Sequence, residues 1–302
     1  MNRFLWLVRR EVAEHRAIWI APAIVIGCLF LLLMLARAHL GFDVNASFAD
    51  VPRDGQIRLH MLAYAMVTAI IFLVMGTVGF FYCIDALYAD RADRSVLFWK
   101  SLPLSDAETV LSKFATAAVL IPLVATAGAV IAHLAIGGGL MAKFALSGHY
   151  PGLWLHPHAI AGGAAMALAT CVVAVLWYAP VVSYLMLASA WAPRAPFLWA
   201  VLPPVAAAVL EAVVLRTSYV RDLVMERLFG LYAAFGERRP DGQPDRGDVN
   251  GLAELAERLG EVDWQARVLE FLRAPDLWAG VVVAALLLAA AMWVRRYRDE
   301  TS

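Results

Sequence analysis

The chain has 302 residues, of which 62% are hydrophobic and 17% are charged, and its mean hydropathy is +0.69. An ordinary soluble domain has about 25% charged residues, so this composition excludes a water-soluble fold. The formal net charge is zero, with 25 basic and 25 acidic residues. This balance excludes the excess of basic charge that is typical of nucleic-acid-binding proteins, and we expect no nucleic-acid partner.

The first 16 residues predict an amphipathic helix. Its apolar face carries Phe4, Leu5, Leu7, Val8 and Val12. The arginines and glutamates lie mostly on the other faces, so we expect residues 1–16 to lie in the inner membrane interface, near anionic headgroups. The alternative is that this helix extends the first span into the cytoplasm.

Six apolar segments are long enough to cross a bilayer, which takes about 20 residues for roughly 30 Å of hydrocarbon. They are residues 17–36, 61–84, 114–136, 158–189, 196–215 and 277–294. The fourth contains Pro180, which lacks a backbone donor and predicts a kink. We therefore expect an all-α integral membrane protein, with residues 1–302 forming one transmembrane domain.

The distribution of Lys and Arg predicts which side of the membrane holds the termini. The face with both termini carries 12 of these residues near span ends, whereas the short loops of the opposite face carry 4. Cytoplasmic loops have an excess of Lys and Arg, so both termini are predicted to be cytoplasmic.

The external segment between spans five and six, residues 218–276, contains two amphipathic stretches with helical spacing. Their connector, residues 237–251, is rich in Gly, Pro and Asp, which favour turns. The pattern predicts a helical hairpin that caps the outer mouth of the bundle.

The segment between spans two and three, residues 85–113, is rich in charged residues and contains signals for the end of one helix and the start of another. Pro103 ends one element, and Ser105 with Glu108 forms a capping box that predicts a new helix from Asp106 into span three. The preceding stretch alternates charged and aromatic or aliphatic residues. We expect it to form a short helix along the inner surface.

Two patterns in this segment carry a resemblance: Tyr-x-Asp-Arg-x-x-Arg-Ser at residues 88–95 and Trp-Lys-Ser-Leu-Pro-x-Ser at 99–105. With the six spans, they make the chain similar to the permease subunits of bacterial type-2 ABC transporters. The resemblance implies an exporter of the bacterial inner membrane, in which this segment is a coupling helix that docks on a separate ATPase subunit. The implied ATPase-contacting residues are Asp90, Arg91, Asp93, Arg94 and Lys100. The alternative is an ordinary positive-inside loop with solvated charges.

The resemblance and the motifs that the sequence lacks also predict partners and cofactors. The chain has no Gly-x-x-x-x-Gly-Lys-[Ser/Thr] pattern, so ATP and Mg are expected on the partner ATPase, in two copies, and no cofactor on this chain. Neither Gly-x-Ser-x-Gly nor His-Glu-x-x-His occurs, so we expect a non-catalytic subunit. The other expected partners are membrane lipid and a second copy or a related permease. The alternative function is an ABC-coupled sensor or immunity protein for membrane-active peptides.

Glu211 is an ionisable residue inside the fifth span, which by default suggests a functional site. Two roles remain open: pairing with Arg216, or lining the translocation route or the seam between two permeases. His156 and His158 lack the third and fourth ligands that a zinc site needs, so we expect no metal site.

Overall fold

The computed structural model describes residues 3–35, 51–92, 105–146, 155–235, 254, 256–257 and 263–298. All regular elements in these ranges are helices. Six helical segments there are long and apolar enough to cross a membrane, which confirms the prediction of an all-α membrane protein. They are Ala17–Leu35, Arg53–Ala92, Asp106–Leu146, Pro157–Trp177, Pro196–Leu215 and Pro275–Tyr297.

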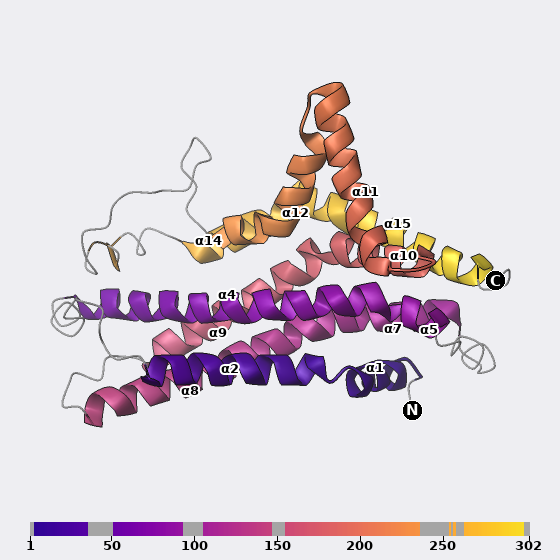
Figure 1. Cartoon of the computed structure of the whole chain (residues 1–302). Helices are drawn as coiled ribbons and strands as arrows, with labels where there is room; N and C mark the ends of the chain where they lie inside the picture. The colour runs from indigo at the N-terminus through magenta and orange to yellow at the C-terminus, as the bar shows by residue number, and fades with distance from the viewer. Residues whose placement is uncertain are drawn as a thin grey trace.

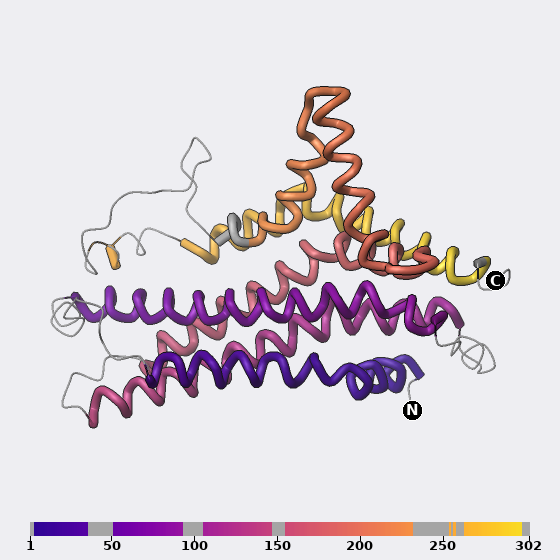
Figure 2. Tube along the Cα trace, viewed as in Figure 1, coloured from indigo at the N-terminus to yellow at the C-terminus, as the bar shows by residue number. Residues whose placement is uncertain are grey.

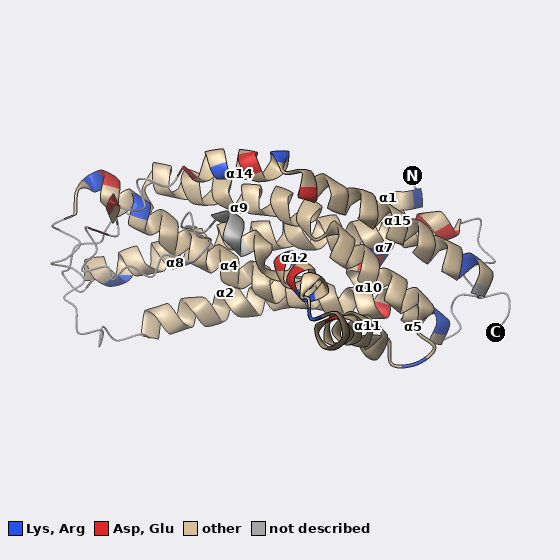
Figure 3. Ribbon diagram, turned by 90° about the horizontal axis from the view of Figure 1, so that it is seen from above, with Lys and Arg blue, Asp and Glu red and all other residues tan. Residues whose placement is uncertain are grey.

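Four long helices form the main bundle: α2 (Ala17–Leu35), α4 (Arg53–Ala86), α8 (Ile121–Leu146) and α9 (Pro157–Trp177). Figure 1 shows them side by side along one axis, and α4 packs against the other three. Their central parts are apolar, and charged residues gather toward the two ends of the bundle (Figure 3). This distribution suits a bundle whose middle lies in hydrocarbon.

Close contacts fix α4 against its neighbours. A Cβ added at Gly163 of α9 would lie 2.8 Å from Cδ2 of Tyr64, so only glycine permits this approach of the two helices. On α8, Nε2 of His133 lies 3.0 Å from the carbonyl oxygen of Tyr64 and 3.1 Å from Oγ1 of Thr68. His133 is therefore a buried residue that links α8 to α4.

The third span is longer than predicted. Helix α7 (Asp106–Ala115) continues through a π-helical segment, η1 (Thr116–Leu120), into α8. Helix α7 begins at Asp106 as the capping box predicts, because Ser105 Oγ accepts from the amide of Glu108 at 3.1 Å and Glu108 Oε2 accepts from the amide of Ser105 at 2.9 Å. A helix that starts at the charged segment thus runs unbroken through the bundle.

The fourth span is broken where its proline predicts. Helix α9 ends at Trp177, and α10 (Ala179–Trp191) begins after the single residue Tyr178, next to Pro180. The change of direction is visible in Figure 2. Helix α10 packs along α15 (Pro275–Arg298), the last span.

The N-terminal helix is a separate element. Helix α1 (Arg3–Glu14) ends before a short break at His15–Arg16, and α2 starts at Ala17. The position of α1 relative to the membrane stays a prediction. Both termini lie at the same end of the bundle (Figure 1).

Helix α11 (Pro196–Leu210), with the π-helical segment η2 (Glu211–Leu215), meets the length and apolarity of a span. It stands out from the bundle with α12 (Tyr219–Phe235) in Figure 1, and Figure 3 shows it nearly end-on. Its axis thus crosses that of the bundle. Helix α12 also packs against α14 (Trp264–Arg273). The connector of the expected outer hairpin, residues 237–251, lies outside the described residues, and that hairpin stays a prediction.

Candidate functional site

Four charged side chains from four different helices meet inside one end of the bundle. They are Glu11 of α1, Asp90 of α5 (Tyr88–Ala92), Lys113 of α7 and Arg295 of α15. Their exposed fractions are 2%, 7%, 3% and 5%. Burial of charge is costly unless the charges are paired, so the pairing decides whether this end of the bundle is stable. We call these four residues, together with Asp106, the charge cluster.

Lys113 lies between two carboxylates of the charge cluster. Its Nζ is 3.0 Å from Oε1 of Glu11 and 3.5 Å from Oδ1 of Asp90. The residue is on the last turn of α7, just before the π-helical segment η1. Lys113 therefore joins the N-terminal helix to both sides of the segment 85–113.

Arg295 makes the second set of ion pairs. Its Nη1 lies 3.1 Å from Oδ2 of Asp90, and its Nε lies 3.3 Å from Oδ1 of Asp106. Asp90 thus uses one oxygen for Lys113 and the other for Arg295. The pairs tie the C-terminal end of α15 to α5 and to the first turn of α7.

Two further side chains complete the surroundings of Glu11. The hydroxyl of Tyr82 donates to Oε2 of Glu11 at 2.9 Å, and Nδ1 of His15 lies 3.9 Å from the same oxygen. The rings of His15 and Tyr82 are in edge contact, with centroids 4.7 Å apart. Both carboxylate oxygens of Glu11 are therefore engaged, which compensates for its burial.

A second set of contacts fixes the end of α4 and the start of α5 to α10. Oγ of Ser189 accepts from the amides of Leu87 at 3.1 Å and Tyr88 at 3.0 Å. Nη2 of Arg91 donates to the carbonyl oxygens of Ser189 at 2.6 Å and Ala192 at 3.1 Å. The guanidinium thus binds carbonyl groups at the C-terminal end of α10 that have no hydrogen-bond partner within the helix. The partial negative charge of a helix C-terminus favours a cation there.

Two of the five residues that the resemblance assigns to ATPase contact lie in the described ranges, at two separate places, and both make contacts within the chain. Asp90 is buried in the charge cluster, and Arg91 binds the end of α10. Asp93, Arg94 and Lys100 lie outside the described residues. Their contact with an ATPase stays a prediction.

Most of the charge cluster was not predicted from the sequence. Glu11 was expected mostly away from the apolar face of the N-terminal helix, but it is buried on the same face as Leu7. For Lys113 and Arg295 the sequence predicted only that they lie near span ends on the cytoplasmic side. A signal existed for Glu11, since it follows Leu7 by four residues and so shares its helix face.

Glu211 is held by one hydroxyl and two backbone amides, and its role in lining a translocation route or a contact between two permeases stays a prediction. Its Oε1 accepts from Oγ1 of Thr217 at 2.6 Å and from the amide of Tyr219 at 2.8 Å, and its Oε2 accepts from the amide of Val220 at 2.7 Å. Within the described residues it forms no ion pair with Arg216. Glu211 caps the N-terminus of α12, where a carboxylate satisfies orphan amides and the positive end of the helix dipole.

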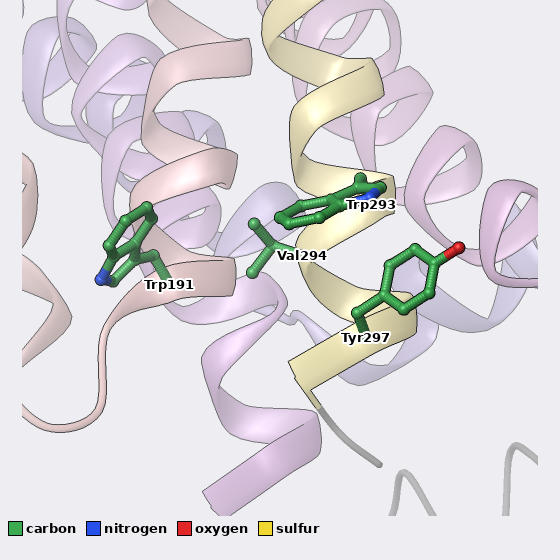
Figure 4. Close-up of a pocket in the computed structure, with 4 residues that line it drawn as sticks. All are labelled: Trp191, Trp293, Val294 and Tyr297. Atoms are coloured by element: carbon green, nitrogen blue, oxygen red, sulfur yellow. The ribbon is translucent and has the colours of Figure 1, made fainter. Parts of the chain in front are cut away.

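An aromatic pocket of about 360 Å³ lies near the charge cluster, between the C-terminal ends of α10 and α15 (Figure 4). It is lined by Trp191, Trp293, Val294 and Tyr297, and Figure 4 shows Val294 pointing from α15 toward Trp191. The rings of Trp191, Trp293 and Tyr297 are about half exposed or more. Trp and Tyr gather where membrane meets water, so this end of the bundle has the composition of an interface.

The described ranges contain no group of three or more His, Cys, Asp or Glu that could hold a metal ion. The rings of His156 and His158 stack with centroids 5.4 Å apart, and Nε2 of His156 lies 3.3 Å from Nη2 of Arg53. These contacts suit a packing role. Comparisons with protein families, curated proteins and solved structures find no match for this chain.

Proposed function

We propose that this chain is the membrane subunit of an ATP-driven exporter and that a separate ATPase moves it through the segment between α4 and α7. The observation that carries the proposal is the charge cluster. It anchors both sides of this segment, through Asp90 and Lys113, to the first helix and to the last span.

A force applied to a segment reaches the membrane helices only if the join is stiff. Here α5 follows α4 after one residue, and α7 runs through η1 into α8. Ser189 and Arg91 add hydrogen bonds to α10. Displacement of this segment would therefore act on α4, α8, α10 and α15 together, which a loosely solvated loop would not do.

The internal contacts of Asp90 and Arg91 refine the expected docking site. In this proposal they are positioning residues that hold the segment. The contacts with the ATPase fall to Asp93, Arg94 and Lys100, which lie between the two anchored sides in sequence. Charged pairs at such a contact would fix its register and its choice of partner.

The remaining features of the proposal rest on the resemblance and on the charge distribution. The chain works in a bacterial inner membrane with both termini in the cytoplasm, beside two ATPase copies that bind ATP and Mg. It pairs with a second permease, and export proceeds along a route between the two. An ABC-coupled sensor or immunity protein for membrane-active peptides would use the same inner end.

The test is affinity purification of the full chain from native membranes in mild detergent, followed by mass spectrometry. A stoichiometric protein with a Gly-x-x-x-x-Gly-Lys-[Ser/Thr] motif is the expected companion. Arg94→Glu should reduce its recovery, whereas Arg53→Glu, at the opposite end of the bundle, should leave it unchanged. Recovery of the chain without any nucleotide-binding protein would contradict the proposal.

A further inference from the structure

The arm, residues 196–226, packs little against the bundle. Only 11% of its candidate span Pro196–Leu215 is buried, the same share as in Ala17–Leu35, whereas the other four candidate spans in the described residues are 33% or 44% buried. At its base, the carbonyl oxygen of Ala200 accepts from the hydroxyl of Tyr184 at 3.1 Å, and the ring of Phe197 lies 6.2 Å from that of Phe80. Beyond this base the arm extends away from the other helices (Figure 1).

The flanks of the arm are apolar and exposed. Large hydrophobic side chains on it include Leu202, Val209, Val213, Val214 and Leu223, each between 55% and 73% exposed. Water solvates such an apolar surface poorly. An exposed apolar area of this extent therefore marks a contact with membrane or protein.

The tip of the arm is polar, which sets it apart from a surface that faces only lipid. It carries Arg216, Thr217 and Ser218 in the turn, followed by Arg221 and Asp222 at the start of α12. Figure 1 shows the tip level with the middle of the bundle's length rather than with either end. A charged side chain near the bilayer centre costs about 2.5–3.5 kcal/mol or more. Hydrocarbon alone therefore does not match the tip.

We propose that the arm packs on a second copy of this chain. The tips of the two arms meet about a two-fold axis. The tip has both signs of charge, with Arg216 and Arg221 against Asp222 and Glu226. A two-fold contact places a surface against itself, so a tip of balanced charge can pair with its own copy while one of single sign cannot. Within one chain Nη2 of Arg221 lies 2.9 Å from Oδ1 of Asp222. In the proposed dimer these exposed pairs exchange partners, so that Arg221 of each copy faces Asp222 of the other.

The size of the arm suits such a contact. Of its 31 residues, 21 are exposed in the single chain, so a contact has to enclose most of the arm to reach the roughly 20 to 30 residues on each side of a stable interface. Glu211 holds the tip in shape by capping α12 before any contact forms. The inference rests on the proposed function in one respect, because it assigns the contact between two permeases.

Cysteine cross-linking in lipid nanodiscs of phosphatidylethanolamine and phosphatidylglycerol tests the arm directly. The starting protein is Cys28→Ser, which removes the one exposed native thiol in the described ranges. Val214→Cys and Leu215→Cys place a thiol on the arm, and Leu32→Cys on α2 is the matched control, because Val214, Leu215 and Leu32 are 70%, 67% and 65% exposed. Under oxidation, at least one arm variant should form a covalent homodimer severalfold faster than the control.

A charge exchange provides the second test. Arg221→Glu should weaken the dimer at least about tenfold, since close charge pairs at an interface contribute about 1.5 kcal/mol or more. Arg221→Glu combined with Asp222→Arg should restore it, because a two-fold contact regenerates the pair with its signs exchanged. The readout is the dimer fraction by mass photometry.

Three results would overturn the inference. Arm thiols that cross-link no faster than Leu32→Cys in a monomeric protein would place the arm in lipid. Cross-links to a different polypeptide would assign another partner, and an unchanged dimer in Arg221→Glu would remove the tip contact. Recovery of an ATPase is measured separately, so a dimer without an ATPase would contradict the proposed function and leave the arm contact standing.

Discussion

Nζ of Lys113 lies 3.0 Å from Oε1 of Glu11, and this buried ion pair joins the first helix of the chain to the helix that leads into α8. The two residues are far apart in sequence, and neither belongs to an apolar span pattern. Their contact makes α1 part of the same mechanical unit as the segment 85–113.

Lys113→Met should destabilise the protein by about 3–5 kcal/mol, because it leaves buried carboxylates of Glu11 and Asp90 without their shared cation. Thermal unfolding of the purified protein in detergent measures the effect. Adding Glu11→Leu should recover part of the loss, since an apolar pair is tolerated where a lone charge is not. Glu14→Gln, which breaks the exposed pair with Arg10, should cost less than about 1 kcal/mol.

Tyr82→Phe removes the hydroxyl that donates to Glu11 at 2.9 Å and keeps the ring. A hydrogen bond to a charged group contributes about 1.5–3 kcal/mol, so a loss of stability in this range is expected. The effect should shrink strongly when Glu11→Gln is already present. A loss of the same size in both backgrounds would show that the hydroxyl does not act through Glu11.

Ser189→Ala leaves the amides of Leu87 and Tyr88 without their acceptor, at a cost of about 1–3 kcal/mol for each buried donor. The amide hydrogen exchange of these two residues should accelerate. Ser183→Ala is the matched control, because Ser183 is equally buried on α10 but bonds only within its own helix, to the carbonyl of Ala179. Equal exchange in the two variants would refute a specific clamp at Ser189.

Glu211→Gln should loosen the tip of the arm. Glutamine has one acceptor oxygen in place of two, so the donors at Thr217, Tyr219 and Val220 are no longer all satisfied. We expect severalfold faster hydrogen exchange at the amides of Tyr219 and Val220. Glu226→Gln, an exposed change on the same helix, should leave these rates unaltered, and unchanged rates in both variants would exclude a capping role.

The spans and several boundaries were predictable because they depend on local sequence. Hydropathy over about 20 residues locates each apolar helix, the missing donor of Pro180 marks the break before α10, and Ser105 with Glu108 sets the start of α7. These features depend on neighbours within a few residues, so a single sequence contains them.

The charge cluster and the arm were not predictable in the same way. Asp90 and Arg295 are 205 residues apart, and their pairing depends on how α5 and α15 pack. The direction of α11 is likewise a tertiary property, since a lipid-facing helix and an arm have the same apolar composition. Glu211 was recognised as unusual, but its backbone partners follow from the turn between α11 and α12, which hydropathy does not describe.

Site-specific photo-cross-linking tests most directly whether a separate ATPase contacts the segment between α5 and α7. A benzophenone side chain is placed at Lys100, and at Arg53 as a control, in cells that express the full set of native membrane proteins. The account predicts a covalent adduct between position 100 and a protein with a nucleotide-binding P-loop, and no such adduct from position 53. Adducts from position 100 that contain only lipid or proteins from outside the cytoplasm would contradict it.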